Sequence, residues 1–282
     1  SSDEKTLCGT TGETAVKTKL YSKSEIISGK TRTTPGTTSS YREPDLVIGS
    51  GTSYDAKEEY YKDILGFESK EKMAEAFVSD YNEMLTSIEK YGGFYIGRYE
   101  LSEAGVQKDK ATLTNTNWYN LYKKCKELNA SDKVETRMIW GCQWDVTMNW
   151  LISSGAKTSN EVNKDSSSWG NYKDSTENAK VTVTEEDGTT TNKYGSKQNT
   201  GYSEYWKANN IYDLAGNCFE WTQEAGYTHY RAVRGGNYSY SGSSNPGSNR
   251  YDYDPALSSG YGTRFSSHFN NKVKIERLIL TV

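Results

Sequence analysis

Five amino-acid types are missing from residues 225–271 of this 282-residue chain: Lys, Glu, Gln, Met and Trp. Elsewhere the chain contains 25 Lys, 23 Glu, 4 Gln, 4 Met and 7 Trp. At that composition, a gap of this length has a chance probability well under roughly one in 10⁵. The absence therefore indicates a constraint on which residues this stretch can contain.

Long apolar runs are also missing, and none approaches the roughly 20 residues that a membrane helix needs. The formal net charge is −3 and no basic cluster is present, which argues against nucleic acid or an anionic membrane as a partner. We therefore expect no nucleic-acid binding and no membrane insertion by this chain. Ser1 and Ser2 look like a processing point, so we expect a targeting or anchoring segment upstream of them.

Cysteine is scarce, and the spacing of the four residues matches no zinc pattern. Cys125 lies in a helical stretch and Cys142 begins another. The two could form a disulfide, or they could be isolated buried thiols, which are equally ordinary. The sequence leaves both alternatives open.

What the gap contains is as informative as what it lacks. In residues 237–261, 18 of 25 residues are Ser, Tyr, Asn or Gly. This mixture is typical of an antibody paratope, where Tyr supplies rigid contact area and Ser, Asn and Gly supply adaptable hydrogen bonds. The stretch therefore predicts a binding surface.

The rest of the chain divides into an extended N-terminal arm, residues 1–65, and one domain, residues 66–282. Residues 69–90 place apolar side chains at helical spacing and end at Gly92, a good helix stop. Further elements are expected as a strand within 92–100, helices at 118–128 and 138–155, and a strand within 230–236. Residues 156–209 are polar and predict an insertion that carries a surface β-hairpin.

Four segments carry a family resemblance: GGFYIGRYE, MIWGCQWD, NIYDLAGNCFEWT and YRAVRGGNYSYSG. The most specific part is D-L-x-G-N-x-x-E-W-T, which begins at Asp213, followed by R-x-x-R-G-G, which begins at Arg231. Over roughly residues 90–265 the chain resembles the formylglycine-generating enzymes and their C-type-lectin-fold relatives. The resemblance implies an α+β, C-type lectin-like fold of the formylglycine-generating-enzyme subtype. It also implies an anchoring role for Arg264.

One branch of that family fits better than the enzymes, namely the variable proteins of diversity-generating retroelements. Their C-terminal surface is rewritten by mutagenesis at adenines. Starting from AAC or AAT codons, such changes cannot produce Lys, Glu, Gln, Met or Trp. Residues 237–261 obey this restriction without exception. The alternative to a diversified region is an ordinary loop that is rich in Gly, Ser and Tyr.

On this interpretation the side chains of the variable region contact a ligand, and its tyrosines are the energetic anchors. The expected binding residues are Asn237, Ser239, Tyr240, Ser244, Asn249, Tyr251, Asp252, Tyr253, Asp254, Ser259 and Tyr261. Behind them, Trp221 is expected in the core and Arg234 is expected to pair with a buried carboxylate such as Glu220.

Catalysis is the first rival hypothesis. The formylglycine-generating enzymes bind copper through two thiols that follow R-G-G, whereas residues 237–250 contain no cysteine. Their iron-dependent relatives need three histidines, and this chain has only His229 and His268, which are expected to be surface contacts. Cys218 is expected to be a buried structural thiol rather than a nucleophile. We therefore expect no enzyme activity, no catalytic residue and no catalytic metal.

A calcium-dependent carbohydrate-binding lectin is the second rival. The triplets that such lectins use for Ca²⁺, E-P-N or Q-P-D with W-N-D, do not occur here. No cofactor is expected, although the family resemblance allows a structural Ca²⁺ near Asn217. The expected partner is a macromolecule, a protein or glycan on another cell or surface. By family analogy the chain would be displayed outside the cell or on a phage particle, as an adhesin or a receptor-binding protein.

Overall fold

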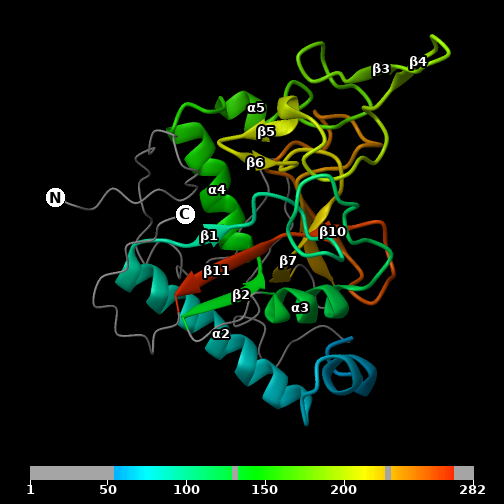
Figure 1. Cartoon of the computed structure of the whole chain (residues 1–282). Coiled ribbons are helices and arrows are strands. Elements are labelled where there is room, and N and C mark those ends of the chain that lie inside the picture. Colours follow the sequence, from blue (N-terminus) through cyan, green and yellow to red (C-terminus); the bar gives the residue numbers. More distant parts are fainter. Residues whose placement is uncertain (1–53, 129–132, 226–229, 270–282) are drawn as a thin grey trace.

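The computed structural model describes residues 54–128, 133–225 and 230–269, and shows a mixed α+β fold with several small sheets (Figure 1). The long helix α2 (Lys70–Tyr91) begins at Ser69, whose side chain accepts a hydrogen bond from the Lys72 amide, and ends at Gly92 with φ of 81°. Met73, Phe77, Tyr81, Met84 and Ile88 are all buried. The helix expected from spacing and from the Gly92 stop is confirmed.

Two further helices confirm sequence predictions. Asn117 caps α3 (Trp118–Glu127), and α4 (Gly141–Ser153) is separated by two residues from the strand β2 (Val134–Met138). No helix in the described part of the chain combines the length and apolar character needed to cross a membrane.

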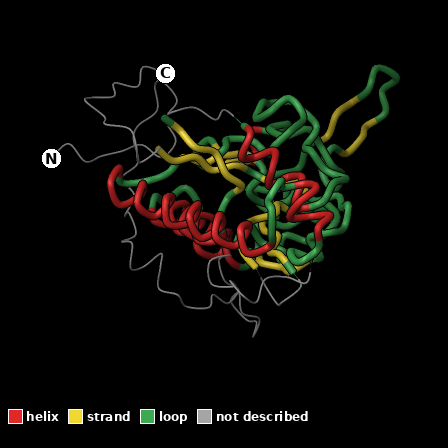
Figure 2. The backbone as a smooth tube through the Cα atoms, turned by 90° about the horizontal axis from the view of Figure 1, so that it is seen from below, coloured by secondary structure: helices red, strands yellow, loops and turns green. Residues whose placement is uncertain are grey.

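A three-stranded antiparallel sheet lies against α2. Its order is β1 (Tyr95–Ile96), β11 (Phe265–Phe269) and β2 (Val134–Met138). The strand expected within residues 92–100 is thus only two residues long. α2 covers this sheet on one side, as Figures 1 and 2 both show.

A second sheet supports the predicted variable region. It has the order β10 (Gly262–Thr263), β7 (Glu220–Ala225), β8 (Arg231–Arg234) and β9 (Arg250–Tyr253). β10 runs parallel to β7, and the other pairs are antiparallel. The strand expected within 230–236 is confirmed as β8. The predicted variable region therefore includes one edge strand, β9, and ends just before the opposite edge strand, β10.

Residues 156–209 are only partly a surface insertion. The predicted hairpin forms from β3 (Thr182–Thr184) and β4 (Thr190–Asn192) and projects from the rest of the fold (Figure 2). Around it lie α5 (Ser159–Asn163), the short helix η3 (Glu204–Trp206), β5 (Lys207–Ala208) and β6 (Ile211–Tyr212). Val162, Trp169 and Tyr172 are buried in a core cluster with α4. Large aromatic side chains therefore fix this polar stretch to the core despite its few aliphatic residues.

The end of the predicted N-terminal arm is not extended. Residues 59–64 form the π-helix η2 (Glu59–Ile64), and the Tyr60 ring stacks on Tyr119 with centroids 4.5 Å apart. Residues 1–53 of the predicted arm lie outside the described residues. The burial of Asp55 and Tyr60 explains the difference, because the segment contributes to the core rather than to the solvent-exposed surface.

The disulfide alternative for Cys125 and Cys142 is wrong. The two thiols are not joined to each other: both are buried, Cys125 in a core cluster with α3 and Cys142 in a separate cluster at the start of α4. Cys218 is free and buried as expected, and burial raises the pKa of its thiol well above the ordinary value. Cys8 lies outside the described residues.

Candidate functional site

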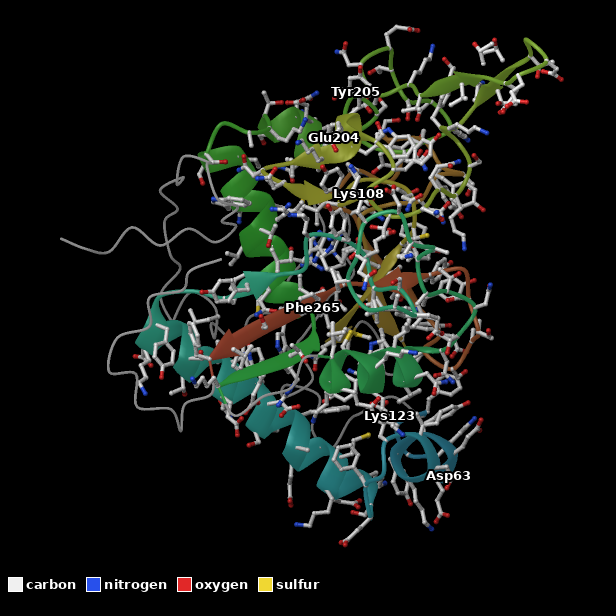
Figure 3. The ribbon with its side chains drawn as sticks, in the orientation of Figure 1. Asp63, Lys108, Lys123, Glu204, Tyr205 and Phe265 are labelled. Atoms are coloured by element: carbon white, nitrogen blue, oxygen red, sulfur yellow. The ribbon has the colours of Figure 1, made fainter. Side chains whose placement is uncertain are left out.

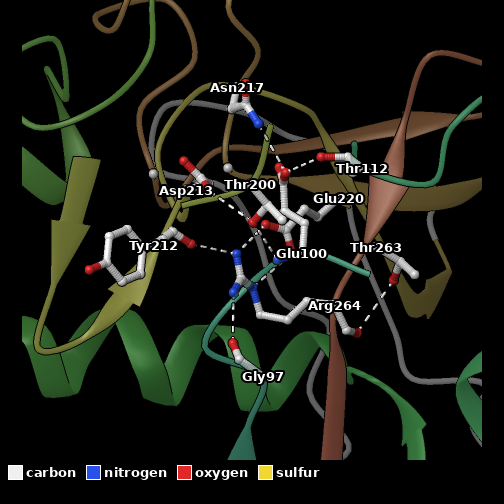
Figure 4. A network of polar contacts seen from close by, with 12 residues as sticks. Gly97, Glu100, Thr112, Thr200, Tyr212, Asp213, Asn217, Glu220, Thr263 and Arg264 are labelled. Atoms are coloured by element: carbon white, nitrogen blue, oxygen red, sulfur yellow. Dashed lines mark hydrogen bonds and ion pairs between the residues drawn. The ribbon is translucent and has the colours of Figure 1, made fainter. Parts of the chain in front are cut away.

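The frame behind the predicted binding surface contains a buried ion pair between Arg264 and Glu220 (Figure 4). The Arg264 guanidinium donates from Nε to Glu220 Oε2 at 3.0 Å and from Nη2 to Oε1 at 2.7 Å. It also donates to the carbonyl oxygens of Gly97 and Tyr212, each at 2.7 Å. Both charged side chains are fully buried. This bidentate geometry joins three distant segments and fits the anchoring role expected of Arg264.

Arg234 pairs with a buried carboxylate, as predicted, but the carboxylate is Glu224 and not Glu220. Its guanidinium lies 3.6 Å from Glu224 and donates to Asp145 Oδ1 at 2.7 Å, whereas Glu220 pairs with Arg264. Arg250, which falls inside the predicted variable region, is buried in the same group and donates to Glu224 Oε2 at 2.8 Å. Arg250 therefore belongs to the frame.

Two more carboxyl groups lie in the interior next to the Arg264–Glu220 pair. Glu100 Oε2 accepts from Asn217 Nδ2 at 2.9 Å and from the Thr112 hydroxyl, whereas its Oε1 has no hydrogen-bond partner among the described residues. Asp213 Oδ2 accepts from Gly201 N at 2.7 Å, and its Oδ1 is likewise without a partner. Burial raises the pKa of Asp213 to about 6 and holds that of Glu100 well above its usual range.

The Asn217 side chain is fully engaged with protein groups. Its Oδ1 accepts from Gln198 N at 3.0 Å and from Asn171 Nδ2 at 3.1 Å, and its Nδ2 donates to Glu100 and to Gln198 O. The carbonyl oxygen of the amide is therefore already used by two donors, which does not fit a calcium ligand. Within the described ranges, no group of three or more His, Cys, Asp or Glu side chains is placed to hold a metal ion.

The four tyrosines predicted as anchors come together. The rings of Tyr253 and Tyr261 meet edge to face with centroids 4.8 Å apart. Burial raises the pKa of Tyr261, a hydrogen bond with Tyr253 raises it further, and the nearby hydroxyls of Tyr240 and Tyr251 contribute electrostatically. We call Tyr240, Tyr251, Tyr253 and Tyr261 the tyrosine cluster.

The floor of this cluster comes from β7 and the residue directly before it. Phe219 contacts Tyr261 at 5.3 Å and Tyr240 at 5.7 Å between ring centroids. Trp221 is fully buried, as predicted, and lies 5.8 Å from Tyr261 by the same measure. The sequence analysis did not select Phe219 as part of the site, although it stands beside the E-W-T motif.

The cluster is exposed at its outer members. Tyr240 is 47% and Tyr251 is 53% exposed, whereas Tyr253 and Tyr261 are half-buried. Leu257, at 48%, is also exposed. Among the described residues, three of the six large exposed hydrophobic side chains thus lie in residues 237–261, so this region presents an aromatic and apolar surface.

Two predicted contact residues are instead buried. Asn237 is 8% exposed, and its Oδ1 accepts from the Ser239 amide at 2.8 Å and hydroxyl at 2.9 Å, which holds the turn after β8. Asn249 is 9% exposed, and its carbonyl oxygen accepts from Arg234 Nε at 2.8 Å. As buried turn residues, both stabilise the frame and do not offer a ligand their side chains.

The other predicted contacts are partly or fully accessible. Ser239 and Ser244 are exposed, and Ser244 Oγ lies 2.6 Å from Ser241 Oγ. Asp252, Asp254 and Ser259 are half-buried. The Ser244 amide also donates to Ser241 Oγ at 3.2 Å, so the contacts of Ser244 are with its own turn.

His268 does not lie on the surface. It is buried on β11, neither ring nitrogen has a hydrogen-bond partner in the part of the chain that the structure describes, and burial lowers its pKa to about 4. A neutral imidazole in the three-stranded sheet is a core residue rather than a surface contact. His229 lies outside the described residues.

Comparisons with known proteins add little to this geometry. No family model matches the chain, and no curated protein matches it. Among solved structures, the chain is similar to Treponema denticola variable protein 1, with 16% sequence identity and a TM-score of 0.31. That alignment covers 81% of this chain and 84% of the other. A likeness this distant assigns neither an activity nor a ligand to the present chain.

Proposed function

We propose that this chain is a non-catalytic binding protein whose ligand face is built on the tyrosine cluster and diversified by a retroelement. The proposal is carried by one observation: Tyr240, Tyr253 and Tyr261 share a floor formed by Phe219 and Trp221, and Tyr251 lies close enough to Tyr261 to raise its pKa. Exposed tyrosines on a rigid support are effective binding residues because little side-chain entropy is lost when a ligand is bound.

The frame and the face contain different kinds of residue. Buried ion pairs such as Arg264–Glu220 hold the second sheet, while short polar and aromatic side chains cover its outer end. Changes at the exposed positions leave buried groups untouched, so this arrangement can accept many sequences without loss of fold. The gap in residue types across 225–271 supports the same division.

The ligand is proposed to be a protein or glycan on another cell or surface. The chain would then act as a displayed adhesin or a phage receptor-binding protein, of the C-type lectin-like, formylglycine-generating-enzyme subtype. Aromatic side chains flanked by serine and asparagine suit both ligand classes, because their rings offer apolar contact and their neighbours offer hydrogen bonds.

The proposal is tested by asking whether the face can acquire a new specificity. One library of the full chain is randomised at the seven exposed non-glycine positions of the predicted variable region, and its displayed variants are selected for binding to hen lysozyme as a model protein. These positions are Ser239, Tyr240, Ser243, Ser244, Tyr251, Leu257 and Ser258. A matched library randomises seven exposed positions of α2: Glu71, Lys72, Glu75, Ser79, Asn82, Thr86 and Glu89. We expect lysozyme binders from the first library and none of comparable affinity from the second. Equal yields, or none from the first library, would contradict the proposal.

A further inference from the structure

We infer that Tyr54, which lies outside the predicted variable region, is a positioning residue of the ligand face; this rests on the function proposed above. Its hydroxyl donates to Asp254 Oδ2 at 2.6 Å, a contact between residues 200 positions apart. The other oxygen, Asp254 Oδ1, accepts from Ala256 N at 2.8 Å. Both oxygens of this carboxylate are therefore held, one by the turn itself and one by Tyr54.

Tyr54 is itself fixed in place. Its carbonyl oxygen accepts from the Lys57 amide at 2.9 Å, and the Lys57 ammonium lies 4.8 Å from the centroid of its ring. The ring also meets Tyr60 edge to face at 6.3 Å between centroids. The backbone of Tyr54 and its ring are thus both held by neighbouring residues, so the hydroxyl that donates to Asp254 has a fixed position.

The next residue fastens this segment to the sheet. Asp55 is buried, pairs through Oδ2 with Arg231 Nη2 at 2.8 Å, and accepts at Oδ1 from the Tyr119 hydroxyl at 2.6 Å. Arg231 stands opposite Tyr253 in the pairing of β8 with β9. The segment is therefore attached to the strand beside the one that carries Tyr251 and Tyr253.

This attachment matters because β9 lies at an edge of the described sheet. It pairs with β8 alone among the described strands, and Asp254 is the first residue after it. The turn that follows presents Leu257, whose amide donates to the Asp254 carbonyl oxygen at 3.3 Å. By holding Asp254, Tyr54 orders this turn before a ligand arrives, which avoids the loss of affinity that ordering on binding would bring.

The first test needs no ligand. In the full chain, Tyr54→Phe removes only the hydroxyl, and we expect amide hydrogen exchange at Ala256 and Leu257 to speed up about tenfold or more. The matched control is Tyr212→Phe, which removes a hydroxyl that donates to Glu204 Oε1 at 2.7 Å. Glu204 lies at the opposite end of the molecule from Asp63 of η2 (Figure 3). Unchanged exchange at Ala256 and Leu257 in Tyr54→Phe would overturn the inference, whatever the lysozyme library yields.

The second test uses lysozyme-binding variants from the library above, all of which keep Asp254. We expect Tyr54→Phe to weaken lysozyme affinity by about fivefold or more, and Tyr212→Phe to leave it within about twofold. Asp254→Asn keeps an oxygen acceptor for the Ala256 amide, and its new N–H group can donate to the Tyr54 hydroxyl oxygen, so it should retain affinity. Asp254→Ala removes both hydrogen bonds and should weaken affinity at least as much as Tyr54→Phe. In the Tyr54→Phe chain, Asp254→Ala should cost less affinity than it does in a chain that keeps Tyr54.

Two failures can be told apart. A first library without lysozyme binders contradicts the proposed function, and the exchange measurement then still decides the role of Tyr54 in ordering the turn. Lysozyme binders that are indifferent to Tyr54→Phe, or independent additive losses from Tyr54→Phe and Asp254→Ala, contradict the positioning role alone.

Discussion

The rings of Tyr253 and Tyr261 lie 4.8 Å apart at an interplanar angle of 79°. Tyr253 ends β9 and Tyr261 directly precedes β10, and these strands are the two opposite edges of the four-stranded sheet. The pair therefore closes over the central strands β7 and β8, above Trp221, which contacts both rings. One aromatic contact thus connects the two edges of this sheet.

Tyr251 and Tyr253 should respond differently to truncation. Tyr251 is 53% exposed, so Tyr251→Ala should change the free energy of unfolding by no more than about 0.5 kcal/mol. Tyr253 is half-buried against Trp221 and Tyr261, so Tyr253→Ala should lower it by about 1–3 kcal/mol. Urea denaturation of both variants measures the difference.

Both changes should weaken lysozyme binding in library variants that retain these tyrosines, because both rings contribute to the cluster. A large loss of stability from Tyr251→Ala would show that its ring is a core residue. It would then have to be removed from the set of contact residues.

The buried Arg264–Glu220 pair should be essential to the frame. Arg264→Met leaves Glu220 buried without its partner and should lower the free energy of unfolding by about 3–5 kcal/mol. Adding Glu220→Gln should recover part of that loss, because the uncompensated charge is removed. The control is Lys62→Met, which breaks an exposed pair with Glu58 and should leave the free energy of unfolding nearly unchanged, because solvent screens the pair. Similar effects of Arg264→Met and Lys62→Met would rule out this role for the buried pair.

The interior carboxyl groups should make stability fall as pH rises. Burial raises the pKa of Asp213 to about 6, that of Glu220 to about 7 despite Arg264, and that of Glu100 well above its usual range. Unfolding exposes them to water, where their pKa values are about 4. The folded state thus binds more protons between about pH 4 and pH 7, and its advantage is lost as pH rises through the folded pKa values.

The free energy of unfolding should therefore be lower at pH 8 than at pH 6 by about 1–3 kcal/mol. His268 acts in the opposite direction and offsets part of the difference, because with a folded pKa of about 4 it is neutral in the folded chain and takes up a proton on unfolding near pH 6. Glu100→Gln should reduce the difference, because an amide at that position cannot bind or release a proton. Equal stability of the unmodified chain at both pH values would contradict the account of these groups.

Several features were predictable because they depend on local pattern. The face of α2 follows from apolar spacing between Met73 and Ile88, and its end follows from Gly92. The tyrosines were singled out for a different reason: residues 237–261 draw on a restricted set of residue types, which predicts a binding surface. Composition identified the region, and the convergence of its four tyrosines came from the sheet that carries it.

The rest depends on contacts that sequence pattern does not encode. Asn237 and Asn249 fit the same residue set as their neighbours, yet backbone turns direct them inward. The irregular pairing of β7 between Trp221 and Ala225 places Glu224 next to Arg234 and Arg250, which spacing alone could not show. The Tyr54–Asp254 bond spans most of the chain, and no local signal marks it.

The most direct measurement of the central claim is to sequence the DNA around the gene in several isolates. We predict a near-copy of the segment encoding residues 237–261 beside a reverse transcriptase gene, differing from it only at adenines. Differences among isolates should fall on codons for accessible positions such as Tyr240 and Tyr251, with Arg250 and Tyr54 constant. The absence of any such copy, with substitutions spread evenly over buried and exposed codons, would contradict the claim that this face is diversified to bind a ligand.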